Sequence, residues 1–111
     1  MMKLPNGHKA VVVIEKLRDY CLNPRHQRGR HKARVFAASL GLTAQDAERL
    51  RDLLIEAARH ADAVPTERDA YGQRYTVDCH TQGRGGPVWI RSNWIVRCGE
   101  DSPRLTSCFV L

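Results

Sequence analysis

The sequence predicts an α+β domain in which N-terminal helices pack on one face of a roughly four-stranded antiparallel sheet. Two observations predict it: apolar residues recur with the helical period of about 3.6 as far as residue 62, and with the strand period of about 2 from residue 64 onwards. Helices that precede an antiparallel meander cover one face of its sheet and leave the other open. At 111 residues the chain is long enough for one modest core. We therefore expect a single domain, 1–111, with a helical part at about 14–62 and a sheet part at about 64–111.

Three helices are expected in the first part, each with its own start or stop signal. A proline disfavours helix in the residue before it, a glycine is the usual residue after the last turn, and a hydroxyl residue followed three positions later by an acid is a common start. The predicted helices are one from Ile14 that stops at Asn23-Pro24, one over 30–40 that Gly41 closes, and one that Thr43 caps with Asp46 and that ends at Val64-Pro65.

The second part alternates between apolar and polar residues, which places them on opposite faces of a sheet. QRYTVDCHT, VWIRSNWIV and RLTSCFVL are predicted strands, with a further strand near Val64–Arg68. The register predicts that Trp94 and Phe109 lie in the core and that Cys108 lies on the opposite face. The open face is predicted to carry Arg74, Thr76, Asp78, His80, Arg91, Asn93, Arg104 and Thr106.

Positive charge is concentrated in one segment. The formal net charge is +6, and no Asp or Glu lies between Tyr20 and Gln45. A local cationic patch attracts an anionic partner, and nucleic acid is the usual large anion. The cations of this segment, NPRHQRGRHKARVF, are Arg25, Arg28, Arg30, Lys32 and Arg34, with His26 and His31 among them.

The sequence contains no signal for a membrane, a metal or a cofactor. The longest apolar run, Ala10–Ile14, is far too short to span a bilayer, and the first residues lack the apolar region of a signal peptide. We therefore expect a cytoplasmic protein with no membrane partner. The cysteines show no C-x-x-C spacing, which favours buried free thiols over a zinc site or a disulfide framework. They are Cys21, Cys79, Cys98 and Cys108.

Four segments form a pattern that covers nearly the whole chain: LPNGHKAVV, EKLRDYCLNPRHQRGRHKARVF, YGQRYTVD and WIVRCGEDSPRLTSCFV. This pattern resembles a small bacterial family catalogued as a domain of unknown function, whose members occur alone and at the C-termini of polymorphic toxins. The family motif falls on Gly29, Arg30, His31, Lys32 and Ala33, and on Trp94, Ile95, Pro103, Arg104 and Leu105. One departure is HQRG, where the family pattern has histidine-proline before the turn.

The order of elements is also similar to the barnase–EndoU–colicin–RelE group of ribonuclease folds, in which N-terminal helices precede a four-stranded antiparallel sheet. This likeness implies RNA as a substrate. It supplies no catalytic residues, because a fold does not determine a function, so these have to be inferred from chemistry.

Metal-independent RNA cleavage needs a base for the 2′-hydroxyl, an acid for the leaving oxygen and cations for the phosphorane. Positive neighbours disfavour the imidazolium form of His31, which leaves it able to accept a proton, so we predict His31 as the base. Lys32, Arg34 and Arg91 would then bind the phosphate, with Thr106 as a further donor, while Arg25, Arg28, Arg30, Arg104 and Trp89 would contact the rest of the nucleic acid. The simpler alternatives are a capping role for His31, a solvated basic face, and an exposed His80, which is otherwise the next candidate for acid or base.

Two functions remain open on the sequence alone. The first is a toxin-like ribonuclease that a small cognate inhibitor protein neutralises. The second is a non-catalytic module that binds nucleic acid or an acidic protein through the same basic segment. In either case the acidic third helix offers a surface for homodimer formation, through Asp46, Glu48, Asp52, Glu56 and Asp62.

Overall fold

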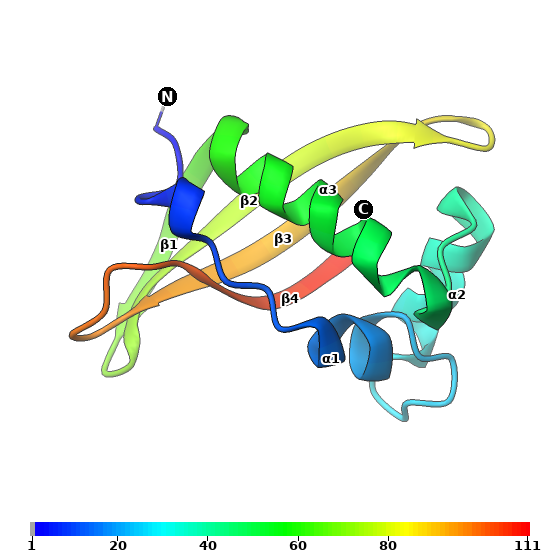
Figure 1. Cartoon of the computed structure of the whole chain (residues 1–111), viewed down its shortest axis with the longest axis horizontal. Coiled ribbons are helices and arrows are strands. Elements are labelled where there is room, and N and C mark those ends of the chain that lie inside the picture. The colour runs from blue at the N-terminus through cyan, green and yellow to red at the C-terminus, as the bar shows by residue number, and fades with distance from the viewer. Residues whose placement is uncertain (1) are drawn as a thin grey trace.

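Four antiparallel strands in the order β1-β2-β3-β4 form one sheet in the computed structural model of the protein, which describes residues 2–111 (Figure 1). The strands are β1 (Ala63–Asp69), β2 (Gly72–Gly83), β3 (Gly86–Arg97) and β4 (Arg104–Val110). Strands that follow one another in the chain are paired, as in a simple meander. All the helices precede the sheet in the chain, so the predicted α+β fold class is confirmed.

The helical elements begin and end close to the predicted signals. They are η1 (Gly7–Lys9), α1 (Ile14–Lys16), the π-helical turn η2 (Leu17–Cys21), α2 (Arg30–Leu40), η3 (Ala44–Asp46) and α3 (Ala47–His60). Gly41 follows α2 with a φ of 69°, a left-handed conformation that glycine adopts without strain. The capping box is present, since the backbone N–H of Thr43 donates to the Asp46 carboxylate at 2.9 Å. The third helix ends at His60, close to the predicted limit of 62, and β1 includes the strand expected near Val64–Arg68.

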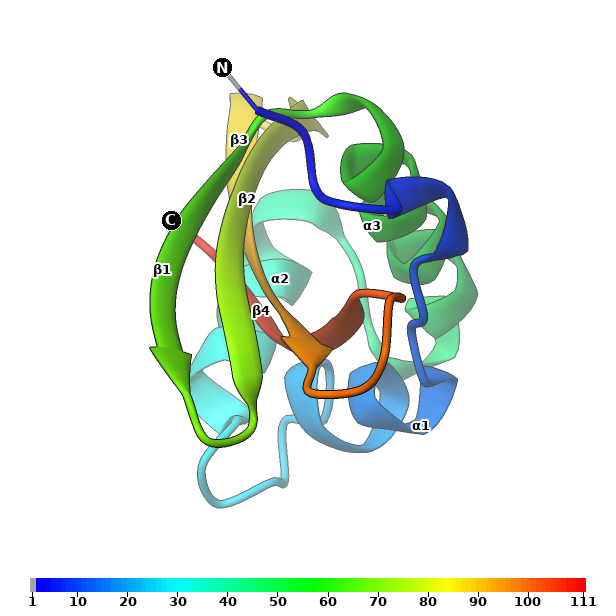
Figure 2. The same cartoon turned by 90° about the vertical axis from the view of Figure 1, so that its left-hand side faces the viewer.

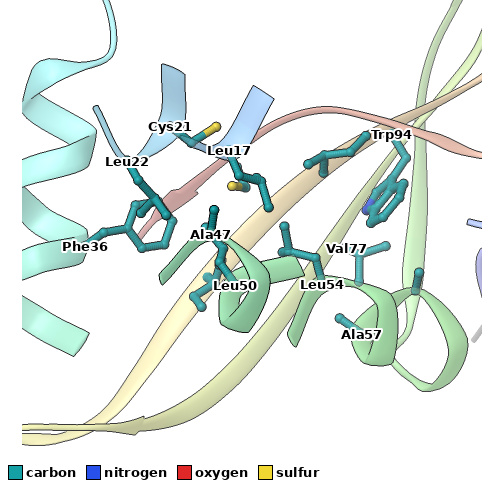
Figure 3. Packing of buried hydrophobic residues seen from close by; sticks show 14 of the residues in the cluster. Leu17, Cys21, Leu22, Phe36, Ala47, Leu50, Leu54, Ala57, Val77 and Trp94 are labelled. Carbon is teal, nitrogen blue, oxygen red and sulfur yellow. The ribbon is translucent and has the colours of Figure 1, made fainter. Parts of the chain in front are cut away.

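The core lies between α3 and the sheet and continues under α1 and η2. Figure 2 shows the strands on one side and α3 on the other, and Figure 3 shows Leu50 and Leu54 of α3 beside Val77 and Trp94 of the sheet. Trp94 is fully buried, as predicted. Burying a large apolar side chain contributes about 1.5–3 kcal/mol, so this layer is the main source of stability.

One predicted core position is wrong, because β4 contains a bulge. The pairing of β3 with β4 shifts between Asn93 and Trp94, which leaves Thr106 as an extra residue in β4. An extra residue reverses the alternation beyond it, so Cys108 is buried and Phe109 lies on the open face, opposite Arg91. The polar open face is otherwise confirmed, and Asp78 and Arg91 are cross-strand partners on it.

The N-terminal segment 2–11 crosses the molecule and touches both edges of the sheet. At the β1 edge, the backbone N–H of Ala63 donates to the carbonyl of Met2, and Lys3 forms a bridge with Asp62. At the β4 edge, Val11 forms a parallel bridge with Arg104. We call residues 2–11 the N-terminal strap. Figure 2 shows it as the blue segment that passes in front of α3.

Candidate nucleic-acid interface

The loop that leads into α2 is held by side-chain acceptors. The side-chain oxygen of Asn23 accepts the backbone N–H of Arg25 at 2.9 Å. Nδ1 of His26 accepts the backbone N–H groups of both Arg28 and Gly29, each at 3.1 Å. The lone pair of Nδ1 thus serves two neighbouring N–H groups of the loop backbone. The loop that displays the cations is thus ordered by a histidine for which the sequence indicated no role.

Gly29 lets this loop approach the first helical segment closely. A Cβ atom at Gly29 would lie 2.5 Å from the carbonyl oxygen of Tyr20, which no side chain tolerates. The same tyrosine packs its ring against His26, with ring centroids 4.4 Å apart and planes inclined by 64°. The loop is therefore packed onto η2 at two points and presents its cations from a fixed position.

The arginines of this segment are exposed and carry no neutralising carboxylate. Every ion pair found within residues 2–111 uses other cations. A guanidinium group on the surface without a carboxylate keeps its full charge for a ligand. The exposed basic residues of the segment are Arg25, Arg28, Arg30, His31 and Arg34. We call residues 25–34 the basic segment.

The arginines of the open sheet face, by contrast, are paired with acids. Arg91 donates to both carboxylate oxygens of Asp78, at 2.8 and 2.9 Å, and these hydrogen bonds hold the pKa of Asp78 below its ordinary value. Arg104 is paired with Glu100 in the same way, at 3.1 and 3.2 Å. Arg74 is paired with Asp69. The sheet face is therefore close to electrically balanced, and the excess positive charge lies in the basic segment.

A ladder of polar groups crosses the middle of the open face. Thr76 donates to the side-chain oxygen of Asn93 at 3.0 Å, and the amide nitrogen of Asn93 donates to Ser107 at 3.0 Å. Thr106, a predicted phosphate donor, gives its hydroxyl proton to the backbone carbonyl of Asn93 at 3.1 Å. A polar hollow of about 330 Å³ lies here, lined on this face by Thr66, Glu67, Arg74, Thr76, Asn93 and Thr106.

Lys32 joins the basic segment to the open sheet face. Its ammonium nitrogen lies 4.6 Å from the centre of the Phe109 ring, a cation–π contact. Phe109 is the cross-strand partner of Arg91. Lys32 and Arg91, which are far apart in the sequence, thus belong to one surface. The sequence did not show this contact, because it depends on the bulge that turns Phe109 outward.

His31 is placed differently from its neighbour. It is exposed, whereas Ala33 and Phe36 mark the buried side of α2. Successive helical residues are about 100° apart, so His31 and Lys32 point in different directions. Within residues 2–111, no side-chain hydrogen bond, ion pair or ring contact links His31 to Arg91, Arg104 or Thr106.

His80 and Trp89 form a second aromatic group on the open face. They are cross-strand partners in β2 and β3, and their ring centroids are 4.8 Å apart. Both side chains are exposed. Alternation along each strand places His80 and Trp89 on the open face, and the register of the β2–β3 hairpin makes them neighbours.

The acidic residues of α3 and its flanks are largely engaged within the chain. Asp46 caps the helix, Glu56 contacts His60 at 3.3 Å, and Asp62 contacts Lys3 at 3.1 Å. In the part of the chain that the structure describes, no three metal-binding side chains come together and no helix is long and apolar enough to cross a membrane.

A protein-family model matches residues 3–111 of the chain, and its description is domain of unknown function (DUF6883). No curated protein and no solved structure matches the chain.

Proposed function

Since the chain belongs to the DUF6883 family, whose description names no activity, we propose a function from its own surface: the domain binds RNA through the basic segment. The observation that supports this most directly is the contrast between two sets of arginines. Those of the open sheet face are paired with carboxylates, whereas Arg25, Arg28, Arg30 and Arg34 are exposed without such partners in residues 2–111. Exposed guanidinium groups close together in the chain suit phosphates, which release counterions when they bind.

We further propose that the bound RNA is cleaved without a metal, as by a toxin-like ribonuclease. His31 would take the proton of the 2′-hydroxyl, and Lys32, Arg34 and Arg91 would hold the phosphate. The contact chain from Lys32 through Phe109 to Arg91 supports this, since it joins helix and sheet cations in one surface. Such an enzyme would act in the cytoplasm and would need a small inhibitor protein to protect its host.

The second candidate is a non-catalytic RNA-binding module. This candidate is favoured because the side chains that catalysis would use already have hydrogen-bond partners within the protein. Arg91 is bound to Asp78, Arg104 is bound to Glu100, and the Thr106 hydroxyl donates to a backbone carbonyl. Groups held in this way are available to a phosphate only if the RNA displaces their partners. The two candidates share the basic segment and differ in whether any RNA is cut.

RNA binding is tested by its salt dependence. Arg28→Ala combined with Arg30→Ala should reduce the slope of log affinity against log salt by about 1 for each phosphate that the variant no longer neutralises. The matched control replaces Arg68 and Arg97, two exposed arginines outside the basic segment, and changes the net charge equally. Equal effects of the two double variants, or an affinity that does not depend on salt, would contradict the proposal.

Cleavage is tested with purified protein and RNA in the presence of a chelator. If His31 is the base, His31→Ala should lower the rate by about 10²–10⁴-fold while RNA affinity stays nearly unchanged. Arg34→Ala should weaken affinity as well as rate. If His31→Ala cuts as fast as the original protein, His80 becomes the candidate base. Absence of any cleavage, together with harmless high-level expression in a host, favours the binding module.

A further inference from the structure

The open sheet face carries one large aromatic side chain that the fold itself does not use. Of the two tryptophans, Trp94 is fully buried, whereas Trp89 is 48% exposed. The ring of His80 lies beside it, with centroids 4.8 Å apart and planes inclined by 56°. Exposure on this scale leaves much of the indole surface free for a flat ligand.

The surroundings of Trp89 combine apolar, acidic and cationic groups, since its side chain lines a groove of about 350 Å³ together with Leu53 and Glu56 of α3. Leu111 donates its backbone N–H to the carbonyl of Trp89 at 2.9 Å and is itself 57% exposed. The pair of Arg91 and Phe109 lies further along the sheet, and Lys32 lies on the Phe109 ring. Asp78, the acid beside Arg91, is bound to it.

The helix α2, whose first residues belong to the basic segment, runs past the strands that carry Trp89 and Phe109. Near its start, α2 contacts β4 through Lys32 and Phe109, and near its end Ser39 accepts the backbone N–H of Arg84 in the β2–β3 hairpin at 3.1 Å. Along β3, Trp89 lies between the hairpin and Arg91. Figure 1 shows α2 at the same end of the molecule as this hairpin. The hairpin that carries the aromatic pair is therefore contacted by the helix in which Arg30 and Arg34 are exposed.

We propose that Trp89, with His80 beside it, stacks an unpaired base of single-stranded RNA whose phosphates lie on the basic segment and Lys32. The inference rests on the proposed RNA binding and adds the class of RNA. A base inside a duplex has both faces covered by its neighbours, so only an unpaired base can offer a face to an indole ring. Aromatic side chains beside a cationic groove are the usual means of holding single strands without sequence preference.

Fluorescence gives a direct test, because Trp94 is buried and Trp89 is the accessible emitter. The probes are a single-stranded RNA oligonucleotide and its duplex with the complementary strand, at the same low salt concentration. Single-stranded RNA should quench the emission of Trp89. Trp89→Phe, which keeps an aromatic ring but lacks the accessible indole, should remove the quenching and should bind more tightly than Trp89→Ala. Trp89→Ala should weaken single-strand binding by about 5- to 150-fold and duplex binding much less.

The outcomes separate this inference from the proposal beneath it. If Trp89→Ala binds single strands as well as the original protein, while Arg28→Ala with Arg30→Ala still weakens binding, base stacking is wrong and RNA binding stands. Base stacking is also wrong if the protein binds duplex and single-stranded RNA equally well and Trp89→Ala weakens both to the same extent. If no RNA binds at all, both proposals fail, and the exposed tryptophan is then better assigned to a protein partner. Circular dichroism of Trp89→Ala should match the original, since the side chain is outside the core.

Discussion

The indole nitrogen of Trp94 donates a hydrogen bond of 2.9 Å to the hydroxyl oxygen of Ser92, a residue two positions earlier in the same strand. The Ser92 hydroxyl donates in turn to the backbone carbonyl of Val77 in β2, at 3.1 Å. All three residues are fully buried. The largest side chain of the core is thus fixed in position by a polar chain that joins β3 to β2, and Ser92 satisfies two groups at once.

Ser92→Ala should therefore destabilise the protein by about 1–3 kcal/mol, because it leaves the indole N–H of Trp94 without a partner in the core. Urea unfolding, followed by circular dichroism, measures the change. Ser107→Ala is the matched control, since its hydroxyl is partly exposed and water can replace it as a partner for Asn93. Equal losses of unfolding free energy in the two variants would show that the buried hydrogen bonds of Ser92 contribute no more than the exposed one of Ser107.

Gly29→Ala should displace the basic segment, because the added methyl group would clash with the Tyr20 carbonyl. We expect a loss of roughly 1–3 kcal/mol in stability and weaker RNA binding at low salt. Gly85→Ala is the control, since a Cβ atom there has no neighbour within 4 Å in the described residues. An unchanged affinity in a folded Gly29→Ala protein would mean that the loop need not be fixed to bind.

Asp78→Asn should strengthen RNA binding if Arg91 contacts phosphate, because the substitution removes the carboxylate that now holds the guanidinium. The gain expected from one released cation is roughly fivefold at low salt. Asp69→Asn frees Arg74 and changes the net charge by the same amount, so it reports the effect of charge alone. Filter binding of both variants decides the matter, and equal gains would remove Arg91 from the interface.

Acid should weaken the fold through the paired carboxylates. Hydrogen bonds from Arg74, Arg91 and Arg104 lower the pKa of Asp69, Asp78 and Glu100, respectively. A carboxyl group whose pKa is lower in the folded than in the unfolded state adds stability above the unfolded value, about 3.9 for Asp and 4.3 for Glu, and loses it as the pH falls through the folded value. The urea midpoint should therefore decline below about pH 4. In Asp78→Asn this decline should be shallower, and an identical decline would argue against a contribution from Asp78.

Thiol modification should distinguish the cysteines by burial. Cys98 is exposed, whereas Cys21 and Cys108 are each only 1% exposed. The hydrogen bond with Cys108 lowers the pKa of Cys21 to about 7, yet a buried thiolate reacts only when the structure opens. With a disulfide reagent at pH 8, Cys98 should react rapidly and Cys21 slowly, at a rate that denaturant increases. Cys98→Ser should remove the rapid phase, and a rapid phase that remains would place another thiol at the surface.

Much of the fold could be predicted, because local chemistry determines it. Gly41 and the Thr43–Asp46 pair mark helix ends through backbone geometry that depends only on nearby residues. Alternation in β2 and β3 assigned Val77 and Trp94 correctly to the covered face. These signals depend on residues that are close in the sequence, so a single sequence is enough to recognise them.

The candidate interface could be predicted only in part, because it depends on contacts between distant segments. The charge of the basic segment is visible in the sequence. The sequence does not show that Arg91 is paired with a carboxylate, because this depends on the register of β2 and β3, which places Asp78 opposite Arg91. The position of Phe109 depends on a single extra residue in β4, for which the sequence gives no clear signal. The role of His26 could not be predicted, because its partners are backbone N–H groups and the sequence pattern of side chains does not reveal them.

The N-terminal strap has a consequence for the order of events during protein synthesis. Its two anchors, at Asp62 and at Arg104, lie far downstream of it in the chain. A ribosome therefore releases the strap long before either anchor exists, and β4 follows the other three strands. Before β1, β2 and β3 are made, the early helices have no sheet to cover, so apolar residues such as Leu17 and Leu50 lack their partners in the core. The strap can therefore take its place at the edge of β4 only after that strand has been made, so this contact should form late in folding.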